Sequence, residues 1–131
     1  ATTFLSNFGA TMSKTTNFQD LVVWQEAHKL VLEIYRTTSN FPSHELYGLV
    51  SQMRRAAVSV PANIVEGFKR RGTADKLRFY NISEASLEEL KYYLILAKDL
   101  GYSEENPQLT QQTDSVGRLL YRFIESIQPP R

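Results

Sequence analysis

The side chains that could carry acid–base or metal chemistry are few in this 131-residue chain and poorly grouped. Cysteine is absent, and the two histidines, His28 and His44, lie on different segments. A di-iron site in a helical bundle needs Glu-x-x-His pairs, but the residues three positions before the histidines are glutamine and phenylalanine. Glu88 and Glu89 are adjacent, so on a helix they point about 100° apart and do not converge. We therefore expect no catalytic residue, no metal site and no cofactor.

The short motifs of common enzyme classes are also missing. None of the patterns GxxxxGK[ST], GxGxxG, GxSxG or HExxH occurs in the chain. The best remaining catalytic group is Glu66 with Arg55 and Asn63, and these residues are better explained by a structural role, as argued below. We expect the protein not to be an enzyme.

The clearest chemical signal is a cluster of basic residues in the middle of the chain. Fifteen Lys+Arg against 14 Asp+Glu leave a net charge of only +1, yet the segment 69–78 holds five positive charges and one negative. These five, which we call the basic rim, are Lys69, Arg70, Arg71, Lys76 and Arg78. Clustered cations neutralise phosphates, which predicts sequence-tolerant binding to the RNA or DNA backbone. The alternative is that the first three only complement the negative end of a helix dipole, each worth about 0.3–1 kcal/mol.

Four segments must position these groups, and each shows the apolar spacing of three and four residues that is typical of amphipathic helices. The segments are 17–38, 43–71, 73–100 and 106–127. None alternates with a period of two, so no strand is expected. Four helices with short connections favour antiparallel neighbours. The sequence therefore predicts an all-α fold, an up-down-up-down antiparallel four-helix bundle.

Local signals mark the ends of these helices. The predicted N-caps are Asn17, Ser43, Thr73 and Asn106, the last followed by Pro107 at the first helical turn. Gly72 is expected to end the second helix, since glycine readily adopts the left-handed conformation found at helix C-termini.

Outside the predicted bundle, residues 1–16 are rich in Thr, Ser, Asn and Gly and show no periodicity. We interpret them as a flexible N-terminal arm or upstream extension, with Met12 as a candidate native start, and 17–128 as the bundle. Lys14 in this arm and Arg131 at the other end are expected beside the basic rim. No apolar run is long enough to span a membrane and no signal peptide is recognised, so we expect no membrane association and a cytoplasmic protein.

The second helix differs from an ordinary bundle helix because it is apolar on both sides. Val58, Pro61, Ala62 and Val65 lie opposite its core stripe on a helical wheel. A helix that is apolar nearly all round is usually buried on both sides, which predicts a subunit contact at Val58, Ala62 and Val65. The alternative is a harmless exposed patch.

A line of polar residues runs between the two apolar arcs of this helix. Its members are Gln52, Arg55, Ser59, Asn63, Glu66 and Arg70. One interpretation is a ligand-binding face. The other, which we favour, is a ladder of hydrogen bonds and ion pairs at a subunit boundary, in which the middle four side chains satisfy one another. Arg55, Asn63 and Glu66 therefore join the predicted oligomer interface.

Several stretches of the chain resemble one bacterial family. They are FQDLVVWQEAHKLVLEIYRTT, FPSHELYGLVSQMRRAAVSVPANIVEGFKRR, the turn Leu87-Glu88-Glu89-Leu90 and the ending Leu100-Gly101-Tyr102. This pattern resembles the four-helix bundle proteins encoded in intervening sequences of large-subunit ribosomal RNA genes. Those proteins are similar to the accessory variability proteins of diversity-generating retroelements. The resemblance runs from Phe18 to Ile127 and is most specific over residues 51–67.

The resemblance implies a bundle that assembles as a ring-shaped homopentamer with no established enzymatic activity. Some relatives are associated with a reverse transcriptase and bind nucleic acid through a basic surface. We therefore expect a non-enzymatic, oligomeric accessory protein that binds nucleic acid through the basic rim. The alternative is a scaffold for a protein partner such as a polymerase, with incidental affinity for nucleic acid.

Overall fold

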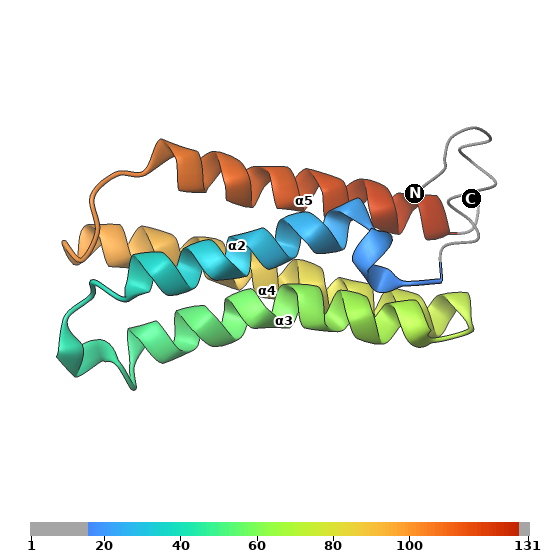
Figure 1. Cartoon of the computed structure of the whole chain (residues 1–131), viewed down its shortest axis with the longest axis horizontal. Coiled ribbons are helices and arrows are strands. Elements are labelled where there is room, and N and C mark those ends of the chain that lie inside the picture. Colours follow the sequence, from blue (N-terminus) through green and yellow to red (C-terminus); the bar gives the residue numbers. More distant parts are fainter. Residues whose placement is uncertain (1–15, 129–131) are drawn as a thin grey trace.

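The protein is described by a computed structural model that covers residues 16–128 and contains four long helices (Figure 1). The helices are α2 (Val22–Thr38), α3 (Leu49–Lys69), α4 (Thr73–Asp99) and α5 (Pro107–Ile127), and short 3-10 helices η1 (Phe18–Asp20) and η2 (Ser43–Glu45) precede α2 and α3. Helix α3 packs against α2 and α4, and α5 packs against the same two helices from the other side. Consecutive helices run in opposite directions, and residues 16–128 include no strand. The predicted all-α, up-down-up-down four-helix bundle is confirmed.

One apolar stripe from each helix forms the core, as the spacing of three and four residues predicts. The largest fully buried side chains are Leu30, Ile34, Met53, Val60, Ile64, Tyr80, Leu90, Val116 and Leu120. Two hydroxyls within the core are satisfied, because Ser83 Oγ donates to Val60 O at 2.8 Å and Thr113 Oγ1 donates to Leu109 O at 2.8 Å.

The first two helices start later than the sequence predicts. Asn17 makes no side-chain capping bond, and extended backbone at Leu21 separates η1 from α2. Ser43 begins η2 rather than α3, and Leu46, which lies between η2 and α3, is 47% exposed. The reason is that Glu45 caps α3 from four residues back: its Oε1 accepts the backbone N–H of Leu49 at 3.0 Å.

The left-handed conformation predicted for Gly72, at the end of the second helix, is also wrong. Helix α3 ends at Lys69, Arg70 follows in an extended conformation, and Gly72 is the N-cap of α4 with φ −85°. The positive φ of +80° is found at Gly101, after α4. There the N–H of Tyr102 bonds to Ala97 O and that of Gly101 to Lys98 O, which is the Schellman pattern.

Pro61 is buried and does not lie on the outer face of α3, where the wheel placed it. It is one position from the buried Val60, about 100° around the helix, and so falls at the edge of the core stripe. The outer apolar face is therefore narrower than predicted.

A close approach joins α3 to α4 in the last turns of α3. A Cβ atom on Gly67 would lie 2.5 Å from Tyr80 Cε1, well inside van der Waals contact. Tyr80 is 1% exposed, and its ring packs edge-on against Phe123 of α5 with the centroids 4.9 Å apart. Burial raises the pKa of Tyr80 to about 12. Position 67 thus needs a residue without a side chain, since the ring that fills the space is held on both sides.

At the opposite end of the bundle, Glu45 links η2 to the segment that follows α4. Its Oε2 accepts the hydroxyl proton of Tyr102 at 2.7 Å, and Tyr102 also packs against Phe41. The backbone N–H of Leu49 and the hydroxyl of Tyr102 lower the pKa of the Glu45 carboxyl, because both donate to the charged form.

We expect the contribution of Glu45 to stability to depend on pH. Because its folded pKa lies below the ordinary value of 4.5, the contribution is fully present above that value and is lost as pH falls through the folded pKa. Glu45→Gln should therefore be less stable than the parent at neutral pH, and the difference should shrink in acid. Urea unfolding over a pH series measures it, and a difference that stays constant with pH would contradict the assignment.

Candidate nucleic-acid interface

The basic rim lies at the turn between α3 and α4, at the same end of the bundle as η1 and the end of α5 (Figure 1). Four of its residues have exposed side chains and Lys76 is partly buried. Lys14 and Arg131, expected beside it, lie outside the described residues, as does the predicted N-terminal arm up to residue 15. The structure thus brings the five predicted cations to one short turn and the first turns of α4.

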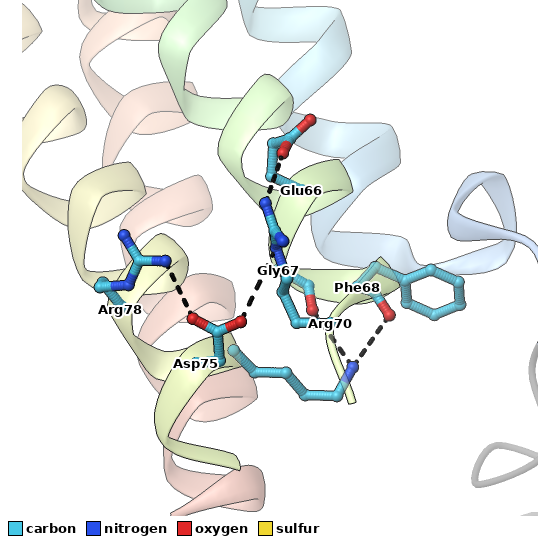
Figure 2. Close-up of polar contacts among 7 residues, drawn as sticks. Glu66, Gly67, Phe68, Arg70, Asp75 and Arg78 are labelled. Atoms are coloured by element: carbon cyan, nitrogen blue, oxygen red, sulfur yellow. Dashed lines mark hydrogen bonds and ion pairs between the residues drawn. The ribbon is translucent and has the colours of Figure 1, made fainter. Parts of the chain in front are cut away.

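Two of the rim arginines converge on one carboxylate (Figure 2). Arg78 Nη2 lies 2.9 Å from Asp75 Oδ1, and Arg70 Nε lies 3.9 Å from Asp75 Oδ2. Arg70 also reaches back to Glu66 Oε1 at 3.2 Å. Both guanidinium groups lie over the ring of Phe79, at 4.6 Å for Arg70 and 4.5 Å for Arg78. The two arginines are therefore held in place and partly neutralised.

Lys76 has a structural role at the end of α3. Its ammonium donates to the backbone carbonyls of Phe68 at 2.9 Å and Gly67 at 3.2 Å in the last turn of α3, where Gly67 O also accepts the backbone N–H of Arg70 at 3.1 Å. Burial lowers the pKa of Lys76. A lysine on α4 thus caps α3, which removes its charge from the most accessible part of the rim.

Lys69 and Arg71 are the most available cations of the rim. Both are exposed, and within residues 16–128 neither takes part in an ion pair. They flank Arg70: Lys69 is the last residue of α3, and Arg71 lies on the connection 70–72 that leads to α4.

The outer surface of α3 retains an apolar patch. Val58 is 40% exposed, Ala62 is exposed and Val65 is partly buried. Beside Val58 and Ala62 a shallow groove is also lined by Tyr35 and Tyr47. Neither tyrosine was predicted to belong to this patch, because they come from α2 and from the segment before α3. Tyr47 is the stronger indication of an interaction surface of the two, because it is 93% exposed.

The polar line on α3 forms two separate groups rather than one ladder. Asn63 Nδ2 donates to Ser59 O at 2.9 Å and to Ser59 Oγ at 3.0 Å, and Ser59 Oγ lies 2.7 Å from Ser86 Oγ on α4. Glu66 instead pairs with Arg70. Within residues 16–128, Arg55 makes no ion pair or side-chain hydrogen bond, so it belongs to neither group. Its side chain is exposed and lines the groove.

The histidines lie against aromatic rings. The ring of His28 stacks on Trp24 with the centroids 5.1 Å apart, and that of His44 lies edge-on to Tyr102. In the described part of the chain, no three His, Asp or Glu side chains are grouped closely enough to hold a metal ion. Among the same residues, no helix is both long and apolar enough to cross a membrane.

Comparisons with known proteins agree with this architecture. A solved structure, that of a protein with unknown function from the S23 ribosomal protein family of Bacteroides thetaiotaomicron, has a TM-score of 0.59 and 21% sequence identity. The match covers 81% of this chain and 94% of that one, which shows a shared fold. No curated protein matches the chain. The family model for the 23S rRNA-intervening sequence protein matches residues 19–122. Because this match spans most of the sequence, the chain belongs to the 23S rRNA-intervening sequence protein family.

Proposed function

We propose that this protein is a non-enzymatic, oligomeric accessory protein that binds the backbone of RNA or DNA through the basic rim. The observation that carries the proposal is the concentration of charge at the α3–α4 turn. Residues 66–78 hold five positive and two negative charges, whereas the whole chain has a net charge of +1. A local excess of this kind attracts phosphates whatever the base sequence.

The contacts of the rim suggest how its residues share this task. Lys69 and Arg71 contact phosphates first because they are exposed and make no ion pair within residues 16–128. Arg70 and Arg78 contribute from fixed positions over Phe79. Lys76 supports the turn through its carbonyl contacts and is not needed for binding in this scheme.

Assembly would multiply these contacts. We propose that the exposed apolar patch on α3, with Val58 and Ala62 at its centre, is covered by a second copy of the chain. The predicted number of five subunits rests on the family resemblance. A closed ring would repeat the rim once for each subunit and give one nucleic acid several points of contact.

We expect the double variant Lys69→Ser/Arg71→Ser to bind a nucleic-acid duplex more weakly than the parent and with a flatter dependence on salt. Each lost phosphate contact should reduce the slope of log affinity against log salt by about 1, equally for unrelated sequences. Fluorescence anisotropy with two labelled RNA duplexes of different sequence, over a salt series, measures this slope.

Arg36→Ser/Lys98→Ser is the matched control for this double variant. It removes the same charge from the opposite end of the bundle, where Arg36 pairs with Glu33 and Lys98 with Glu105. The control should keep the slope of the parent. If the rim variant also keeps it, the rim cations act only on the helix ends and the proposal fails.

A protein scaffold is the second candidate function, and the groove beside Val58 favours it. Tyr35 and Tyr47 expose aromatic rings there next to the guanidinium of Arg55, which makes no ion pair within residues 16–128, and this combination is common at protein interfaces. The partner in this case would be another protein, for which the predicted likeness to accessory variability proteins suggests a reverse transcriptase. Binding to nucleic acid would then be weak and insensitive to salt.

A further inference from the structure

The carboxylate of Asp75 occupies the position between two rim guanidiniums that a phosphate group would suit. One of its oxygens, Oδ1, pairs with Arg78, and the other, Oδ2, pairs with Arg70 (Figure 2). A phosphodiester likewise presents two unesterified oxygens with one negative charge between them. Arginine forks bind carboxylates and phosphates with the same geometry, so one can stand in for the other.

We propose that Arg70 and Arg78 form a phosphodiester subsite that Asp75 fills in the free protein, and that a nucleic-acid phosphate binds there by displacing the Asp75 carboxylate. This inference rests on the proposed function, and it makes the Asp75 carboxylate a competitor of the phosphate at one part of the basic rim. It predicts that removing the Asp75 charge strengthens binding.

The exchange is feasible because the ion pairs are on the surface. The side chains of Arg70, Asp75 and Arg78 are 42%, 43% and 62% exposed, and ion pairs at such exposure contribute little to stability. The guanidiniums would keep their places after Asp75 leaves, because Phe79 lies under both and Glu66 still holds Arg70. The subsite is therefore organised before the phosphate arrives.

A simpler role for Asp75 must be separated from this one. Asp75 is in the first turn of α4, where a negative charge is favourable at the positive end of the helix dipole. In that role it would only stabilise the helix and hold the arginines, and its removal would leave affinity unchanged or reduce it.

Asp75→Asn keeps the shape of the side chain and removes its charge. Using anisotropy with a labelled RNA duplex at low salt, we expect it to bind about fivefold more tightly than the parent, which corresponds to ~1 kcal/mol. Asp75→Ser should give the same gain by a second route, and circular dichroism confirms that each variant is folded. An affinity equal to or below that of the parent in both variants would overturn the proposal.

Two further variants separate the subsite from a general effect of charge. Glu66→Gln removes an equal charge from a carboxylate that pairs with Arg70 alone among residues 16–128, and it should give less than half of that gain. Asp75→Asn should bring no gain in an Arg78→Gln background, because the subsite is then incomplete. A gain that persists without Arg78 would show long-range attraction and would overturn the proposal.

The composition of the buffer tests whether the subsite binds a nucleic-acid phosphate or a free phosphate ion. The gain should persist when inorganic phosphate replaces chloride at equal ionic strength, since the duplex offers neighbouring contacts that a free ion lacks. Loss of the gain in phosphate would assign the subsite to free phosphate and overturn the proposal. Failure of the proposed function looks different: the parent itself would then show no salt-dependent binding.

Discussion

Gly67→Ala is expected to destabilise the bundle by about 1–3 kcal/mol, the usual cost of an extra methyl group in a filled core. Alanine is favoured over glycine in a helix interior by about 1 kcal/mol, so propensity alone predicts the opposite sign. Packing wins because the new Cβ would lie 2.5 Å from the ring of Tyr80, which is buried and backed by Phe123. Thermal unfolding followed by circular dichroism measures the change.

Gly117→Ala provides the matched control for this substitution. Gly117 is also inside a helix, but a Cβ there would meet Leu87 at 3.5 Å, an ordinary contact, so the variant should be neutral or slightly more stable. In the double variant Gly67→Ala/Tyr80→Leu the two changes should partly compensate, since the smaller side chain relieves the clash. Strict additivity of the two single effects would show that the ring is not the obstacle.

Val58→Lys should dissociate the proposed oligomer while leaving helicity almost unchanged. In one subunit Val58 is 40% exposed, so a lysine can extend into water at little cost. In a subunit contact the same ammonium would be buried without a partner, which costs about 3 kcal/mol and lowers each association constant more than a hundredfold. Light scattering at micromolar concentration reports the mass of the assembly.

Leu32→Lys is the control for the loss of an exposed apolar side chain. Leu32 is 57% exposed on α2 and lies outside the patch around Val58, so this variant should assemble like the parent. A parent protein that is a stable monomer would refute the proposed assembly altogether. Dissociation by Leu32→Lys but not by Val58→Lys would place the contact on another face.

The helix ends show what the sequence can and cannot predict about this fold. The start of α5 was predictable because its signal is local: Asn106 Oδ1 accepts the N–H of Leu109 three residues later, and Pro107 takes the first turn. The start of α3 was not, since its cap, Glu45, is oriented by a hydrogen bond from Tyr102, 57 residues away. The spacing of apolar residues predicts which segments are helical, whereas contacts with distant residues determine where some of the helices begin.

The basic rim shows the same limit at the level of the site. The five cations could be predicted by counting charges along the chain, because they lie on the α3–α4 turn and the residues beside it, which form one continuous segment, 69–78. The partners of the arginines depend on how two helices are oriented across the turn, which periodicity does not specify. The spacing of Glu66 to Arg70 and of Asp75 to Arg78 was an available signal, since residues three or four apart on a helix are neighbours.

The tight α3–α4 pair also bears on the order in which the chain folds. These two helices form the most extensive interface of the bundle and are joined by only three residues, 70–72, so their contacts close a very small loop. Pairing α2 with α5 instead joins the two ends of the bundle's sequence and closes the largest loop. Low contact order favours early formation, so the α3–α4 hairpin is the natural folding nucleus. The cations of the rim would then be gathered at one turn before the rest of the bundle has assembled around it.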